Sequence, residues 1–249
     1  MKKVLALFIT AVLVFTLVAC SSEKKSEEVE KAEETKAVEE SGSQTEQEEP
    51  TEDSETLNDG GWVVFEQHVS AKLPKEVYSA IEDVTTADEG TDYSAVAFLG
   101  TSSNTTPVYA VLCQEKNPDG LSYKVIVVKD NVRDTATLLN CAPFYINDYT
   151  QGEGTMSSDA LQVPAKDDVV GWDLPKPYDK LYEKAVKKEK ENLEAISLLG
   201  TKEENGTDYA FICYNTVDNV IQVVTVHEAM NGNTEIQNIC TIDTALFMK

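Results

Sequence analysis

The pattern of apolar and polar positions changes twice along the chain, and each change marks a different kind of segment. Residues 4–18 are predominantly apolar and follow two lysines. Residues 21–58 are almost entirely polar or charged and contain no aromatic residue. From about Gly60, short runs of β-branched and aromatic residues alternate with polar turns. Because a stretch with little apolar surface cannot offset the entropy of ordering, we expect only the part after residue 58 to build a core.

This later part contains an internal repeat. Phe98-Leu99-Gly100-Thr101 returns as Leu198-Leu199-Gly200-Thr201, and residues 109–113 return with the same offset as 209–213. With one residue lost, four further positions align: Val125, Val127, Thr135 and Cys141 fall opposite Val224, Val226, Thr234 and Cys240. A Gly-Trp pair, ending at Trp62 and at Trp172, precedes each copy. Several matches in one order predict a tandem duplication.

Each copy begins with an apolar stripe at helical spacing. In the first, Pro74 suits the first helical position, and the stripe consists of Val77, Ala80, Ile81 and Val84. In the second, the stripe continues over a longer segment and consists of Tyr178, Leu181, Tyr182, Ala185, Val186 and Leu193. We expect both stripes to be core faces of helices rather than cofactor sites.

Short β-branched runs follow each stripe and are separated by turn signals such as Asn117-Pro118-Asp119-Gly120. They cover residues 95–99, 108–113 and 123–129, and then 195–199, 209–214 and 220–226. Strands joined by such short turns form antiparallel meanders. We therefore predict an α+β fold of two tandem units, residues 59–150 and 151–249, each a helix packed on a curved antiparallel sheet.

The start of the chain resembles the signal peptide of a lipoprotein from the surface of Gram-positive bacteria. The apolar run is shorter than the ~20 residues that a membrane-spanning helix needs, and Leu17-Val18-Ala19-Cys20 places small residues before a single cysteine. The resemblance implies that residues 1–19 are removed and that Cys20 carries the lipid. It also implies a place at the extracytoplasmic face of the cell membrane. An uncleaved membrane anchor is the alternative.

Residues 20–58 then form a lipidated, disordered acidic tether. Capture of cations by its glutamates, or a transient helix, are the alternatives. The formal net charge of the whole chain is −23, and acidic residues occur throughout the part that follows the signal peptide. This charge excludes nucleic acid as a partner and disfavours anionic headgroups, so we expect membrane contact through the lipid alone.

The second copy resembles the cystatin core. In cystatins the first hairpin carries a Gln-x-Val-x-Gly loop followed by Thr-Asn-Tyr, and here the segment reads Gly200-Thr201-Lys202-Glu203-Glu204-Asn205-Gly206-Thr207-Asp208-Tyr209. Lys202 and Glu204 stand in place of the Gln and the Val. The resemblance implies a helix wrapped by a meander and a candidate binding hairpin. The residues of this hairpin are Lys202, Glu204, Asn205, Gly206, Thr207 and Tyr209.

The sequence gives little sign of catalysis. His68 and His227 lie in different copies with no cysteine or second histidine at ligand spacing, so we expect no metal site. A nucleophile elbow, a phosphate-binding loop, a dinucleotide fingerprint and a calcium loop are all missing from the sequence. We expect no catalytic residue, no cofactor and no enzyme, although a site assembled between the copies is an alternative.

The cysteines at 113, 141, 213 and 240 stand at equivalent positions of this alignment, and an exported protein can form disulfides. In a simple meander, the cysteines of one copy lie on strands separated by a third, about 9 to 10 Å apart. A disulfide needs no more than about 7 Å between Cα atoms. We expect buried thiols; bridging across the copies is the alternative.

These expectations lead to two functions of different classes. The first is a non-catalytic, membrane-anchored surface lipoprotein that presents two cystatin-like units to an unknown extracellular protein or peptide. The second, implied by the resemblance of residues 200–209, is a tethered inhibitor of cysteine proteases. Trp62 and Trp172 are expected to fill the core or an interface.

Overall fold

The structure is a computed structural model, and it describes a discontinuous part of the chain. The described residues are 55–56, 62–64, 71–86, 91–102, 104–150, 154, 156–158, 160–163, 174, 176–187 and 192–249. The chain divides into two compact units, Met1–Glu49 and Pro50–Lys249, and every described residue belongs to the second unit. Within this described part, no helix is both long and apolar enough to cross a membrane. The signal peptide, Cys20 and most of the tether lie outside the described residues.

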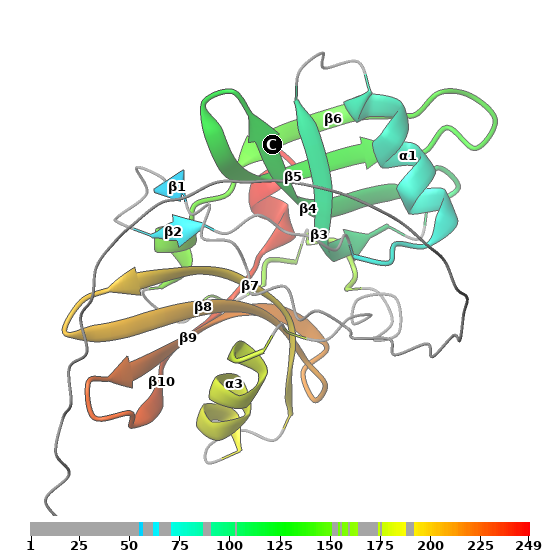
Figure 1. Ribbon diagram of the computed structural model, residues 1–249. Coiled ribbons are helices and arrows are strands. Elements are labelled where there is room, and N and C mark those ends of the chain that lie inside the picture. The colour runs from blue at the N-terminus through cyan, green and yellow to red at the C-terminus, as the bar shows by residue number, and fades with distance from the viewer. Residues whose placement is uncertain are drawn as a thin grey trace, which may run out of the picture. The chain divides into compact units, whose positions relative to one another are not determined.

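The first copy is a helix on a four-stranded antiparallel meander (Figure 1). The helix α1 spans Lys75–Thr85 and is followed by β3 (Asp92–Thr101), β4 (Val108–Asn117), β5 (Gly120–Lys129), β6 (Thr137–Pro143) and the short 3₁₀ helix η1 (Ile146–Tyr149). Pro74 immediately precedes α1, where its missing N–H costs nothing. The apolar stripe of α1 is buried at Val77, Ala80 and Ile81, as its spacing predicts.

The second copy repeats this order. It consists of α3 (Tyr178–Val186), β7 (Leu193–Glu203), β8 (Gly206–Asn215), β9 (Val220–Ala229), β10 (Thr234–Thr241) and η2 (Thr244–Phe247). The fold is therefore α+β with two helix-and-sheet units, as predicted. The expected length of the second helix is wrong, because α3 ends at Val186 and Leu193 begins β7.

The two copies share their irregularities as well as their elements. The pairing of β3 with β4 skips a residue between Ala95 and Ala97 and again between Phe98 and Gly100. The pairing of β7 with β8 skips a residue at the same two places, 100 positions later. Because a β-bulge re-aims every side chain beyond it, shared bulges are strong evidence that the copies have a common origin.

The strand pairing corrects the alignment of the later strands. Tyr109 pairs with Val128 and Tyr209 with Val226, so the offset falls from 100 to 98 and two residues are lost rather than one. Cys141 is therefore equivalent to Ile239, and Cys240 to Ala142. A slip of one residue reverses the face of the sheet on which a side chain lies, so the cysteines are not placed equivalently.

Three apolar clusters arrange the elements in the order helix, sheet, sheet, helix. One cluster joins α1 to the outer face of the first sheet, and a second joins α3 to the outer face of the second sheet. The largest cluster lies between the sheets and takes side chains from both, among them Val96, Leu112, Ile196 and Ile212. The inner faces of both sheets are buried against each other, so the two copies share one core.

Reciprocal contacts hold the copies together at their ends. Asn140 on β6 donates to the carbonyl oxygen of Phe247 in η2, at 2.9 Å. The equivalent Asn238 on β10 donates to the carbonyl oxygen of Tyr149 in η1, at 3.0 Å. Each short helix thus caps the sheet of the other copy, and an asparagine at the same position of each sheet makes the contact.

The segments that precede each copy also cross over. The short strand β2 (Val63–Val64) pairs with β7 through Val63 and Thr201, and β1 (Glu55–Thr56) pairs with β2. In the same way, Gln162 pairs with Thr101 of β3. Both crossings place an apolar side chain in the shared core, Trp62 in one and Leu161 in the other. Trp62 fills the core as expected, whereas Trp172 lies outside the described residues.

Because the inner faces depend on each other, neither copy should fold alone. We expect the separate fragments 50–150 and 151–249 each to lack near-ultraviolet circular dichroism and cooperative unfolding. Mixing them from denaturant should restore both signals together with a one-to-one complex in size-exclusion chromatography. Cooperative unfolding of either fragment by itself would contradict the shared core as the main source of stability.

Candidate functional site

The candidate hairpin predicted from the sequence is the β7–β8 turn. Lys202, Glu204, Asn205, Gly206, Thr207 and Tyr209 all lie on it. The Lys202 ammonium and the Glu204 carboxylate form an ion pair of 3.1 Å on the β7 side of the turn. Asn205 has a φ of 54° and Gly206 a φ of 139°. A Cβ at Gly206 would lie 2.8 Å from Cε1 of His227 and closer still to the Glu228 carbonyl oxygen, so glycine is required there.

This hairpin is held firmly by its neighbour. β9 pairs with β8 as far as Gly206, so only Glu204 and Asn205 extend beyond the ladder. Asp208 Oδ1 lies 2.6 Å from Nδ1 of His227, which places that histidine in a strand-to-strand pair. The tip is therefore short and charged, with little apolar surface to insert into a cleft.

A tyrosine and a carboxylate brace both copies in the same way. The Tyr209 hydroxyl donates to Glu228 at 3.2 Å, and the Tyr109 hydroxyl donates to the equivalent Asp130 at 3.5 Å. Partial burial, and then the neighbouring carboxylate, raise the pKa of Tyr209 to about 12 and that of Tyr109 to about 12. A pair that recurs at equivalent positions is part of the scaffold, so we assign Tyr209 a structural role.

The four described cysteines are free thiols. Cys113 and Cys213 are buried on the helix faces of their sheets, and burial raises the pKa of both thiols. Cys141 packs on the same face as Cys113, whereas Cys240 lies in the shared core. Thiols with raised pKa values in apolar surroundings are poor nucleophiles, which agrees with a packing role.

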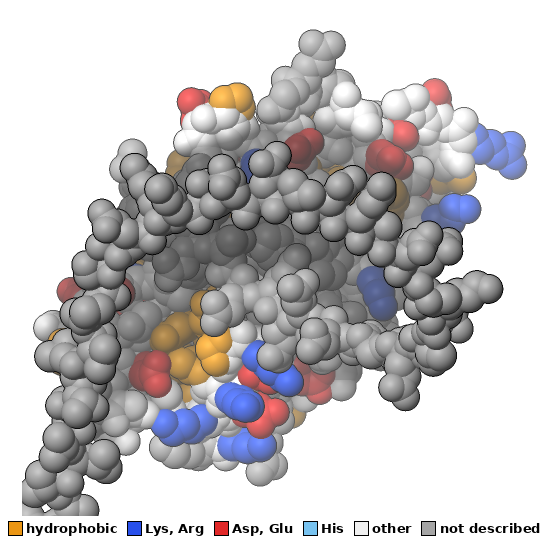
Figure 2. All heavy atoms as spheres, viewed as in Figure 1, with side chains coloured by type: hydrophobic (Ala, Val, Ile, Leu, Met, Phe, Trp, Pro, Cys, Tyr) orange, Lys and Arg blue, Asp and Glu red, His pale blue; other side chains and the backbone are white. Residues whose placement is uncertain are grey.

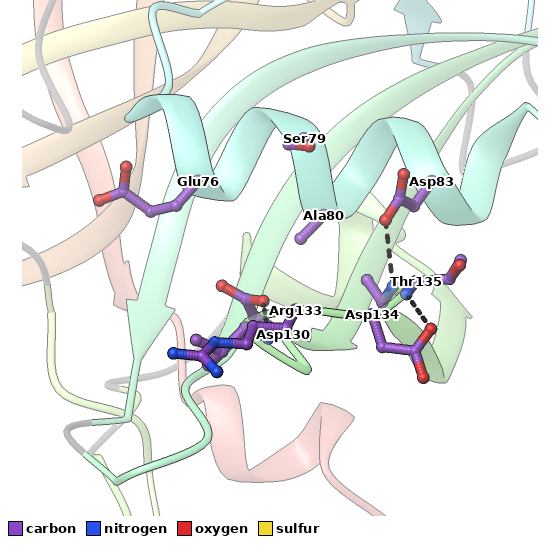
Figure 3. A pocket seen from close by; sticks show the side chains of 10 residues that line it. Glu76, Ser79, Ala80, Asp83, Asp130, Arg133, Asp134 and Thr135 are labelled. Atoms are coloured by element: carbon purple, nitrogen blue, oxygen red, sulfur yellow. Dashed lines mark hydrogen bonds between the residues drawn. The ribbon is translucent and has the colours of Figure 1, made fainter.

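A hollow that sequence reasoning missed lies between α1 and the β5–β6 loop (Figure 3). Glu76 and Asp83 reach it from α1, while Asp130, Arg133 and Asp134 reach it from the loop. Its volume is about 550 Å³. We call it the acidic hollow, because four carboxylates and one guanidinium line it.

The loop that forms the hollow differs from its counterpart of equal length. In the second copy, pairing continues to Glu228 and Thr234, and the Ala229 amide donates to Asn233. In the first copy, backbone pairing ends at Lys129 and Thr137, and the Asn131 side-chain amide bridges the loop by donating to the Thr135 carbonyl oxygen and the Thr137 hydroxyl. Here the exposed Val132 takes a φ of 64°, a conformation that strains a β-branched residue.

The helices also contact these two loops differently. In the second copy, Lys184 of α3 donates its ammonium to the carbonyl oxygen of Gly232, the residue equivalent to Asp134. In the first copy, Asp83 of α1 accepts from the Ala136 amide at 3.1 Å instead. Figure 2 shows Lys side chains gathered over α3. At this place the second copy has a lysine bonded to the loop, whereas the first copy has an aspartate and the acidic hollow.

A group of exposed apolar side chains follows directly on the hollow. Leu138 and Leu139 lie on β6, Tyr145 follows the strand, and Leu246 and Met248 flank the η2 residue whose carbonyl oxygen accepts from Asn140. They are between 40% and 59% exposed. We call these residues the edge patch, because β6 is an edge strand in the described sheet.

The equivalent positions around β10 are polar or covered. Leu139 and Gln237 are the skipped residues of equivalent bulges, and Gln237 is exposed. Ile236, equivalent to Leu138, packs in the α3 cluster. The counterparts of Tyr145, Leu246 and Met248 are Asp243, Asp148 and Thr150. The same backbone arrangement therefore carries exposed apolar residues around β6 and polar or covered residues around β10.

The described residues do not suggest metal chemistry. Among them, no three His, Cys, Asp or Glu side chains are grouped so that they could hold a metal ion, and this includes the carboxylates of the hollow. Comparisons of the chain with protein-family models, with curated proteins and with solved structures found no significant match. The candidate site therefore has to be interpreted from its own geometry.

The backbone strain at Val132 can be tested by a stability measurement. Asparagine tolerates a positive φ, so Val132→Asn should raise the free energy of unfolding by about 1 kcal/mol. Urea denaturation would measure the change. The equivalent Met230 is exposed and has no positive φ, so Met230→Asn serves as the matched control and should have little effect. Equal changes in both variants would contradict a strain specific to the first copy.

Proposed function

We propose that this protein is a non-catalytic surface lipoprotein that binds a protein or peptide partner. Cys20 carries the lipid, residues 20–58 form the tether at the extracytoplasmic face of the cell membrane, and two cystatin-like units are presented beyond it. The proposal rests on one observation above all. The edge patch around β6 is exposed and apolar, while the equivalent residues around β10 are polar or covered.

Surface energetics support this proposal. Exposing several neighbouring apolar side chains costs solubility and gives the fold nothing in return, so contiguous exposed apolar surface usually marks an interaction site. The equivalent sheet edge at β10 has Gln237 opposite Leu139 in the alignment, and Asp148 of η1 opposite Leu246, so the fold itself does not require leucines there. A binding role accounts for them.

Inhibition of cysteine proteases is the alternative. The observation in its favour is the turn at Asn205 and Gly206, whose backbone is fixed by the neighbouring strand and whose following residues, Thr207 and Tyr209, fit the cystatin pattern. The charged Lys202 and Glu204 pair weighs against it, because a wedge that enters a protease cleft must shed its water.

The lipid anchor has a direct test. Cys20→Ala should abolish incorporation of radiolabelled palmitate and move the protein from the membrane fraction to the medium or to an unprocessed precursor. Cys141→Ala should leave both unchanged, since that thiol belongs to the folded part. Palmitate labelling that survives Cys20→Ala would refute the anchor.

Photo-crosslinking on intact cells separates the two functions. A benzoylphenylalanine replacing Leu139 should give a discrete adduct, and one replacing the equivalent Gln237 should not. An adduct from position 204 whose partner is a cysteine protease would favour inhibition instead. If positions 139, 204 and 237 and a scan of the remaining exposed residues all give no adduct, the binding function is wrong.

A further inference from the structure

In the first copy, the acidic hollow and the exposed leucines of β6 are adjacent. Ala136 lines the acidic hollow, and Leu138 lies two residues further along the chain. Leu138 pairs with Val128, whose side chain packs in the α1 cluster, so Leu138 lies on the same face as α1. Leu138 therefore brings the edge patch up to the hollow at the start of β6.

The second copy indicates what chemistry suits the hollow. There, the ammonium of Lys184 occupies the place beside the residue equivalent to Asp134. In the first copy, Arg133 is the single cationic residue in the lining against four carboxylates. A cation supplied from outside would complete the arrangement that Lys184 completes internally, because opposite charges in a partly enclosed hollow attract more strongly than in open water.

The edge of β6 favours contact with a partner through side chains rather than through an added β-strand. The bulge at Leu139 and the terminal Pro143 interrupt regular pairing with an added strand. Recognition must therefore rely on side chains more than on backbone ladders. Leu138 on one side and Leu246 and Met248 beside Asn140 on the other offer apolar surface to the side chains of a partner.

We propose, building on the function proposed above, that this surface binds a basic, apolar segment of a partner protein. A lysine or arginine of the segment enters the acidic hollow beside Asp134, and its apolar side chains cover the edge patch. A second copy of this chain is a poor occupant, since the chain has a net charge of −23 and would bring two acidic hollows together.

The test uses the full-length chain in detergent and a fluorescein-labelled synthetic peptide of leucine, serine and lysine, followed by anisotropy. The wild type should bind this peptide. Leu139→Asp should weaken binding about tenfold, as loss of a central apolar contact does. Gln237→Asp is the matched control, with the same substitution at the equivalent bulge, and should stay within about twofold of wild type.

Charge is tested separately from apolar contact. Asp134→Asn keeps an oxygen for the Thr135 amide, yet should weaken binding and reduce its dependence on salt. A peptide with glutamate in place of lysine, and one with serine in place of leucine, should both bind at least about tenfold more weakly than the parent. Circular dichroism and thermal unfolding must show both protein variants folded.

Several results would overturn the proposal. They are no binding by the wild type, equal binding by Leu139→Asp, and equal binding of the peptide without leucine, which would show attraction by charge alone. A wild-type dimer that Leu139→Asp dissolves would assign the patch to a second copy instead. A partner crosslinked on cells from another position, without any peptide binding, would refute this inference and leave the proposed function standing.

Discussion

The core between the two sheets is the constraint on which the rest of the structure depends. Among the described residues, each sheet has a helix packed on one face, and its other face is buried against the sheet of the other copy. The crossing segments and the reciprocal asparagines fix the relative register of the two sheets at their ends. With both inner faces committed in this way, the surfaces free to diverge are the outer edges and loops.

The two copies can be compared with each other position by position. Features common to both copies, such as the tyrosine and carboxylate pairs and the paired bulges, are explained by folding. Features present in one copy alone need another cause. The open loop with Val132 in a strained conformation and the leucines of β6 belong to this second kind, and they lie side by side in the chain.

Much of the fold was predictable from the sequence, because helical stripes and alternating runs follow directly from side-chain burial. The repeat was also legible in the sequence. Its later register was not, since Val125 and Val127 alternate with other apolar residues and a slip of one position keeps the similarity while reversing the faces. The crossing of β2 to β7 was not predictable either, because two residues carry too little pattern.

The site was harder to predict for a physical reason. The hairpin at Gly206 has a local sequence signature. The hollow, in contrast, depends on α1 meeting a loop more than 45 positions later, where no lysine takes the part of Lys184.

The crossing strands have a mechanical consequence. Tension applied to the chain before β1 passes through β2 into β7, and so loads the second sheet before the first. The first sheet, with the leucines of β6 and the hollow, is therefore loaded later by a pull at that end.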